Sequence, residues 1–216
     1  HRDLHSFPTR RSSDLKDDVD YFALLPSIHE VDKCFQPNDK DATVRLVNIL
    51  KHCLDIYKEL AEQWIVENNL CKRVVDSIDP SFEPIAREAS LGMIIILVKQ
   101  ELSFFNAFIA YGIIPKALSI VKERKVVSIT AFKLLTKCLH YDKVIATVIY
   151  EHLTPTYLVE FLFPLPMEMA RGEAILIKYS VELLWNYLEC PITKEYVNCS
   201  LLVISRALDI PHCDKK

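Results

Sequence analysis

Two Cys/His pairs are the residues whose types and spacing could bind a metal. Cys138 and His140 lie two positions apart, and His212 directly precedes Cys213. A structural zinc site usually takes its ligands from two such pairs at a characteristic spacing, and neither pair here has a partner pair of that kind. The sequence therefore predicts no metal site. Cys138 is expected on the core face of a helix, and His140 is expected to cap the helix end.

The sequence lacks the short motifs that mark common catalytic or cofactor sites. It contains no Gly-rich phosphate loop, no G-x-S-x-G turn and no H-E-x-x-H zinc motif. Acidic residues fall mostly singly on polar helix faces or in first turns, which is the usual solvated arrangement. We therefore expect a protein that is not an enzyme and needs no cofactor. The alternative is an enzyme whose Cys/His or Asp/His group is assembled only by folding.

Composition favours an all-helical fold. The 216 residues include only three glycines, whereas half are hydrophobic, and so few glycines are unusual for folds built on β-turns or phosphate-binding loops. The net charge of −3 gives no basic footprint for nucleic acid. The longest apolar run, Met93–Val98, is far shorter than the roughly 20 residues of a membrane span. We expect neither nucleic acid nor a membrane as partner.

The cysteines are odd in number and widely scattered, a pattern typical of reduced, mostly buried thiols in the cytoplasm. They are Cys34, Cys53, Cys71, Cys138, Cys190, Cys199 and Cys213. The sequence therefore predicts a cytoplasmic protein without disulfides.

The chain divides by composition into four parts. Residues 1–15 are polar, basic and aperiodic, and they resemble a translated sequencing adaptor; we expect them to be artefactual and disordered, in which case the chain is a fragment. A genuine basic tail is the alternative. Residues 16–40 form a lead-in or partial helix, residues 41–210 form the folded part, and residues 211–216 form a tail.

Apolar residues recur at helical spacing from Asp41 onward. Ile94–Val98 is rich in β-branched residues, but it lies within a longer segment, residues 85–100, that predicts a helix rather than a strand. Two apolar faces are expected to be buried. One consists of Leu46, Ile49, Cys53 and Ile56, and the other of Val127, Ala131, Leu134, Leu135 and Cys138.

The helices form a degenerate repeat. Ile65, Ile109, Ile149 and Val197 occupy similar places in four segments, and their spacings are 44, 40 and 48 residues. This is the period of armadillo or HEAT units. Such units are too small to bury their apolar faces alone, so neighbours must stack. The prediction is a right-handed α-solenoid of about four repeats, with an irregular all-α domain as the alternative.

Turn and cap residues predict where the helices break. Gly112 can adopt the left-handed conformation that ends one helix, and Pro115 suits the first turn of the next. The other units carry Asn69, His152 and Cys199 or Ser200 near the corresponding place. Helix starts are indicated by Asp79-Pro80, Asp142 and Thr154-Pro155.

Polar positions on the long helices are the candidate partner-binding residues. The row comprises Lys51, Lys99, Lys133, Lys137 and Lys178, and the line Lys178, Glu182 and Asn186 follows one otherwise apolar helix. Stacked units could bring the lysines together as a groove for an acidic segment of a protein partner. The alternative is that the lysines only solvate an exposed face.

Trp185 and Asn186 are a further candidate pair. Armadillo proteins that bind extended peptides commonly place an asparagine at this position of successive helices, but the corresponding stretches here, LVKQ and LTKC, carry lysine. A peptide reader of the nuclear-import type is therefore disfavoured. We expect Trp185 to lie in the core, with a position on the groove as the alternative.

Three stretches, LVNILKHC, AFKLLTKCLHYDKV and above all SVELLWNYLE, carry a resemblance to a known family. In this order, from Leu46 to Glu189, the chain resembles the armadillo-type cilia- and flagella-associated proteins. The resemblance implies a non-enzymatic scaffold of cilia or flagella, packed among axonemal proteins. No individual binding residue of this chain is inferred from the resemblance. An adaptor in phosphatase regulation, transport or assembly is the alternative function.

Overall fold

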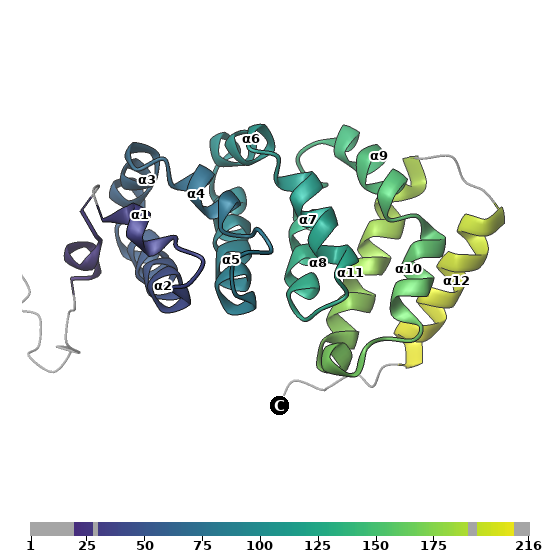
Figure 1. The fold of residues 1–216 in the computed structure, drawn as a ribbon. Coiled ribbons are helices and arrows are strands. Elements are labelled where there is room, and N and C mark those ends of the chain that lie inside the picture. Colours follow the sequence, from purple (N-terminus) through teal and green to yellow (C-terminus); the bar gives the residue numbers. More distant parts are fainter. Residues whose placement is uncertain (1–19, 28–29, 190–193, 210–216) are drawn as a thin grey trace, which may run out of the picture.

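The computed structural model describes residues 20–27, 30–189 and 194–209, and within them it is all-helical, with no strand. Two segments predicted from the sequence, residues 1–15 and 211–216, lie outside the described residues, and the second includes the His212-Cys213 pair. Cys190 also lies outside them. Helices pack on one another along the whole described chain, as Figure 1 shows. This architecture is compatible with a helical solenoid.

The elements follow one another with short connections. The 3₁₀ helices are η1 (Tyr21–Leu24), η2 (Met167–Gly172) and η3 (Tyr187–Glu189). The α-helices are α1 (Val31–Cys34), α2 (Lys40–Ile56), α3 (Lys58–Glu67), α4 (Leu70–Asp76), α5 (Pro84–Gln100), α6 (Leu102–Ala110), α7 (Ile113–Lys122), α8 (Val127–Cys138), α9 (Lys143–His152), α10 (Pro155–Leu162), α11 (Glu173–Asn186) and α12 (Lys194–Asp209). The β-branched run Ile94–Val98 lies inside α5, so the helix prediction is confirmed.

Four helices, α2, α5, α8 and α11, form a row that we call the stacked helices. They begin at residues 40, 84, 127 and 173, so successive starts are 44, 43 and 46 residues apart. Each contacts the next one in the row. Each later member also packs on the α-helix that precedes it in the chain, α4, α7 or α10. In Figure 1 the row runs from α2 near one end of the molecule towards α12 at the other.

Polar contacts between neighbouring groups of helices recur at similar sequence separations. Tyr111 Oη donates to Asn69 Oδ1 across 42 residues, and Thr130 Oγ1 donates to Glu88 Oε1 across the same separation. Lys116 pairs with Asp76 across 40 residues. The chain therefore makes similar polar links each time it advances by about one stacked helix.

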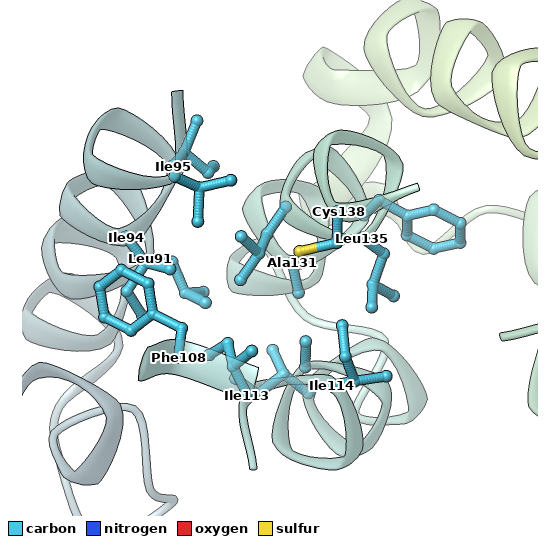
Figure 2. Packing of buried hydrophobic residues seen from close by; sticks show 14 of the residues in the cluster. Leu91, Ile94, Ile95, Phe108, Ile113, Ile114, Ala131, Leu135 and Cys138 are labelled. Atoms are coloured by element: carbon cyan, nitrogen blue, oxygen red, sulfur yellow. The ribbon is translucent and has the colours of Figure 1, made fainter. Parts of the chain in front are cut away.

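The core runs between consecutive stacked helices. Figure 2 shows Leu91 and Ile94 of α5, Phe108 of α6, and Leu135 and Cys138 of α8 around one shared interior. All five predicted core residues of α8 are buried, as expected from the helical spacing. Only part of the predicted apolar face of α2 is buried. Leu46 and Cys53 are buried and Ile49 is half-buried, but Ile56 is 58% exposed because α2 ends there.

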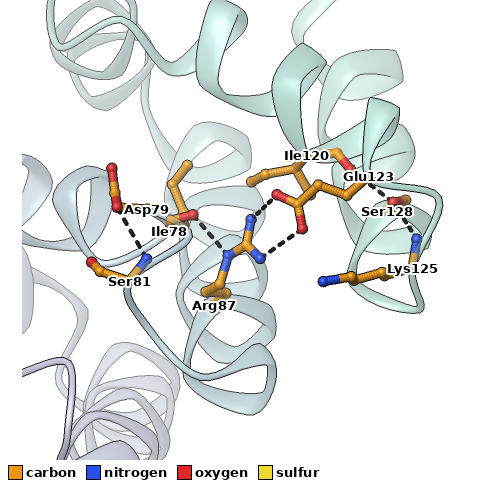
Figure 3. A network of polar contacts seen from close by, with 8 residues as sticks. All are labelled: Ile78, Asp79, Ser81, Arg87, Ile120, Glu123, Lys125 and Ser128. Carbon is orange, nitrogen blue, oxygen red and sulfur yellow. Dashed lines mark hydrogen bonds and ion pairs between the residues drawn. The ribbon is translucent and has the colours of Figure 1, made fainter.

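A buried ion pair fixes α5 to the end of α7. Arg87, whose side chain is 3% exposed, donates from both terminal guanidinium nitrogens to the carboxylate of Glu123, the residue that caps α7 (Figure 3). Its Nε donates to the carbonyl oxygen of Ile78 at 2.9 Å. The guanidinium thus joins α5 to the turn at Ile78, nine residues earlier, and to the end of α7, 36 residues later. Its bidentate contact with Glu123 sets the relative orientation of α5 and α7.

The predicted turn residues behave in two different ways. Gly112 has φ +75° and separates α6 from α7, and Asn69 has φ +49° and separates α3 from α4, so both predicted turns are confirmed. The turn predicted at Cys199 or Ser200 is wrong, because both residues lie inside the continuous helix α12. Neither residue interrupts a helix strongly, whereas glycine and asparagine tolerate left-handed backbone conformations.

Two of the three predicted helix starts are confirmed. Asp142 Oδ1 accepts from Val144 N at 2.8 Å at the start of α9, and Thr154 Oγ1 accepts from Tyr157 N at 3.2 Å at the start of α10. The Asp79-Pro80 prediction is wrong. Asp79 accepts from Ser81 N in a turn, and α5 begins only at Pro84, which occupies the first helical position.

No single helix in the described ranges is long and apolar enough to cross a membrane. The pair α6 and α7 passes this test only when the two helices are taken together, and they are bent by 71° at the break between them.

Gly112→Ala is expected to destabilise the fold by about 1–2 kcal/mol, because φ is +75° and an alanine is strained in the left-handed region. Gly92→Ala is the matched control. Nothing lies within 4 Å of a Cβ placed on Gly92, which sits inside α5, so this change should stabilise the fold by about 0.5–1 kcal/mol. Urea unfolding of both variants measures the difference. If both variants change the free energy of unfolding by the same amount and in the same direction, the left-handed turn assigned to Gly112 is wrong.

Candidate protein-binding surface

Six of the seven predicted partner-binding residues lie on three of the stacked helices, and the seventh, Lys51, lies in α2. Lys99 is in α5, Lys133 and Lys137 are in α8, and the remaining three, Lys178, Glu182 and Asn186, are in α11. Contacts between these helices show how the residues are arranged across them.

Two cross-helix contacts align the polar sides of the three helices. Thr130 Oγ1 of α8 lies 3.5 Å from Glu88 Oε1 of α5, and Lys137 Nζ of α8 lies 3.4 Å from Glu182 Oε1 of α11. Helical periodicity puts Lys133 on the side of α8 that carries Thr130 and Lys137. It likewise puts Lys99, eleven positions after Glu88, on the same side of α5. We call this side, with its six predicted residues, the stacked-helix face.

Glu182 is the centre of a small polar group on the stacked-helix face. Its Oε1 accepts from Lys137 Nζ and from His140 Nε2, at 3.4 and 3.0 Å. The expectation that His140 caps a helix end is therefore wrong: its ring lies just beyond α8 and bonds to the next stacked helix. The contact spans 42 residues, so no local pattern could indicate it.

Asn186 is engaged within its own helix. Its Nδ2 donates to the carbonyl oxygen of Glu182 at 2.7 Å. This bond uses one amide hydrogen to hold the side chain against the last turn of α11. Among the described residues, the second hydrogen and the oxygen have no hydrogen-bond partner.

Trp185 does not lie in the core, so that prediction is wrong. Its side chain is 73% exposed, although its neighbour Leu184 is buried. Because α11 is apolar nearly all round, periodicity could not tell which side has a neighbouring helix. Trp185 instead borders a cleft of about 550 Å³, which is also lined by His140, Asp142 and Asn186. An exposed tryptophan beside polar groups is typical of protein-binding surfaces.

Three of the predicted lysines carry charges that no described residue neutralises by direct pairing. Lys99, Lys133 and Lys178 form no ion pair with any residue in the described part of the chain, whereas Lys137 pairs with Glu182. Lys99 and Lys178 are exposed and Lys133 is half-buried. The stacked-helix face therefore presents positive charge to solvent, with Trp185 at its edge.

The cysteines of the described residues are free thiols, and the two most perturbed are protected from ionisation. Burial raises the pKa of Cys138 to about 12 and that of Cys71 to about 11. Both therefore remain protonated near neutral pH, where a thiol is a poor nucleophile and a poor metal ligand. Within the described ranges, no group of three or more His, Cys, Asp or Glu residues is arranged to hold a metal ion.

Comparison of the chain with protein-family models, with curated proteins and with solved structures finds no match.

Proposed function

We propose that the chain is a non-enzymatic scaffold, a right-handed armadillo-like α-solenoid of about four degenerate units, that binds protein partners. The observation that carries the proposal is the row of stacked helices. Their starts recur every 43 to 46 residues, and each packs on the previous member and on the helix before it. Repetition of one helical group, each contacting its neighbours, is the construction principle of solenoids.

The stacked-helix face is the partner-binding surface in this proposal. Three lysines without ion pairs among the described residues, Lys99, Lys133 and Lys178, favour an acidic segment through complementary charge. Trp185 supplies a large exposed side chain that a partner would bury. Exposed charges mainly increase the rate of association and the specificity, while the aromatic contact contributes affinity.

The cellular setting that we propose is the cytoplasm of a cilium or flagellum, with axonemal proteins as partners. Support for this part comes from the resemblance of SVELLWNYLE and the two earlier stretches to armadillo-type cilia- and flagella-associated proteins.

Capture from an axonemal extract tests the function. The full chain is immobilised, and bound proteins are quantified for the wild type and for Lys99→Glu/Lys133→Glu. The double variant should capture about tenfold less axonemal protein than the wild type, because it reverses the charge of the stacked-helix face. Lys72→Glu/Lys122→Glu is the matched control: it changes the net charge equally at two exposed lysines of α4 and α7.

Two outcomes would contradict the proposal. Equal loss in both double variants would mean that capture depends on overall charge rather than on the stacked-helix face. Capture dominated by phosphatase subunits or transport factors would instead favour an adaptor in another pathway.

A further inference from the structure

An open apolar groove runs between α11 and α12, on the side of α11 that bears Trp185. Its volume is about 290 Å³. The main lining residues are Val181, Leu184, Trp185, Val197, Leu201 and Ile204. Leu201 is 60% exposed, and Val197 and Ile204 are each more than 40% exposed. Large apolar side chains gathered on one exposed surface are typical of interaction sites.

The two walls of the groove run antiparallel. Tyr196 Oη, early in α12, donates to the carbonyl oxygen of Leu184, late in α11. Arg206, late in α12, donates to Glu173 at the start of α11. These contacts at both ends hold the helices together, so the groove is a formed feature of the fold.

A lysine stands near each end of the groove. Lys178 precedes Trp185 by seven positions and Lys194 precedes Leu201 by seven, so each shares a stripe with lining residues of its helix. Because α11 and α12 are antiparallel, the two lysines lie towards opposite ends. Both are exposed, and neither forms an ion pair with any other residue that the structure describes.

The interfaces elsewhere in the chain indicate what fits such a groove. Three of the stacked helices each pack on two helices: the previous stacked helix and the α-helix just before themselves in the chain. These contacts are α5 on α2 and α4, α8 on α5 and α7, and α11 on α8 and α10. The helices α11 and α12 are likewise a stacked helix and a later helix, but they also pack directly on each other, which the earlier pairs α2 and α4, α5 and α7, and α8 and α10 do not do to a comparable extent. In Figure 1, no further described helix lies beyond α12 at this end of the row. Each of the stacked helices α5, α8 and α11 packs on two helices at once, and the groove offers two helices, α11 and α12, to one further helix in a similar way.

We propose that the groove binds an amphipathic α-helix of a partner protein, with an apolar stripe against Trp185 and Leu201 and acidic residues near both ends. The stripe follows the i, i+3, i+4, i+7 spacing by which a helix presents one face to a groove. The acidic residues meet Lys178 and Lys194. This inference rests on the proposed function, since it specifies one class of protein partner and the surface that receives it.

A designed helical peptide tests the proposal on the full chain. The fluorescently labelled probe has about 15 residues, with leucines on one face and glutamates flanking them. Binding is measured by anisotropy, against a peptide of identical composition whose leucines are out of helical register. We expect the first peptide to bind and the second not to bind.

Variants of the chain locate the binding. Leu201→Glu should weaken binding about tenfold or more, because it places a carboxylate in the apolar stripe. Leu60→Glu is the matched control, since Leu60 of α3 is similarly exposed, at 54%, and lies outside the groove. Lys178→Glu/Lys194→Glu should also weaken binding of the acidic peptide, and should reduce its sensitivity to salt.

Several results would overturn the inference. They are absence of binding, equal binding of the out-of-register peptide, and equal loss in Leu60→Glu. Sedimentation showing a dimer that Leu201→Glu dissociates would assign the groove to a second copy. Binding seen only after deletion of residues 210–216 would assign it to the chain's own end. If axonemal capture through the stacked-helix face persists while the peptide fails to bind, the groove inference fails and the proposed function stands.

Discussion

Leu135→Asp is expected to unfold the chain. Leu135 is fully buried in α8, where Figure 2 shows it pointing toward Ile114 of α7. Deleting a buried leucine side chain typically costs about 2–5 kcal/mol, and an unpaired carboxylate in its place adds a desolvation penalty. The sum approaches the total stability of a typical domain, roughly 5–15 kcal/mol. Far-UV circular dichroism should show loss of most of the helix signal.

Two further variants make this result interpretable. Leu135→Ala should stay folded and lose about 3 kcal/mol of the free energy of unfolding in urea. Lys133→Ala, two positions away on the stacked-helix face, should change it by less than about 0.5 kcal/mol. If Lys133→Ala and Leu135→Ala destabilise the chain equally, the assignment of the buried and exposed sides of α8 is wrong.

Glu123→Ala is expected to cost about 3 kcal/mol. The change leaves the guanidinium of Arg87, which is 3% exposed, with the carbonyl of Ile78 as its remaining hydrogen-bond partner among the described residues. Breaking a buried ion pair by removing one partner typically costs about 3–5 kcal/mol. We expect a cost at the lower end of this range because the Glu123 side chain is itself 20% exposed. Urea unfolding measures the change.

A solvent-exposed pair provides the control for Glu123→Ala. Asp76 is 60% exposed and pairs with Lys116, so Asp76→Ala should cost less than about 1 kcal/mol. Replacing both members of the buried pair, as Arg87→Met/Glu123→Leu, should cost less than Glu123→Ala alone, because no buried charge is left unpaired. A double variant less stable than Glu123→Ala would show that the ion pair does not account for the loss.

The same pair makes stability depend on pH. Hydrogen bonding to Arg87 lowers the pKa of Glu123 from its ordinary value of 4.5. A carboxyl group whose pKa is lower in the folded state contributes stability above its unfolded pKa and loses it as the pH falls through the folded pKa. The stability advantage of the wild type over Glu123→Gln should therefore be constant near neutral pH and shrink below about pH 4.5.

Local features of the fold could be predicted from the sequence because their causes are local. Gly112 and Asn69 end helices through their own backbone preferences, and Asp142 and Thr154 cap helices only two or three residues away. The buried face of α8 follows from helical spacing alone. In each case the determining interaction lies within a few residues, where a sequence pattern can reveal it.

Features that depend on contacts between helices could not be predicted in the same way. Arg87 and Glu123 are 36 residues apart, and His140 and Glu182 are 42 apart. The exposure of Trp185 depends on which side of α11 has a neighbour, and an almost wholly apolar helix gives no sign of that side. For the candidate surface, the predicted polar residues do lie in helices, as helical spacing indicated, but the pairing of Lys137 with Glu182 depends on the packing of α8 against α11.

Small-angle X-ray scattering on residues 20–209 tests most directly whether the helices form an extended row. A compact domain of this length has a radius of gyration of about 16 Å. Stacked units that contact only their neighbours predict a clearly larger value and an asymmetric distribution of interatomic distances. A radius near 16 Å with a symmetric distribution would mean that the helices close into a bundle, and would contradict the solenoid.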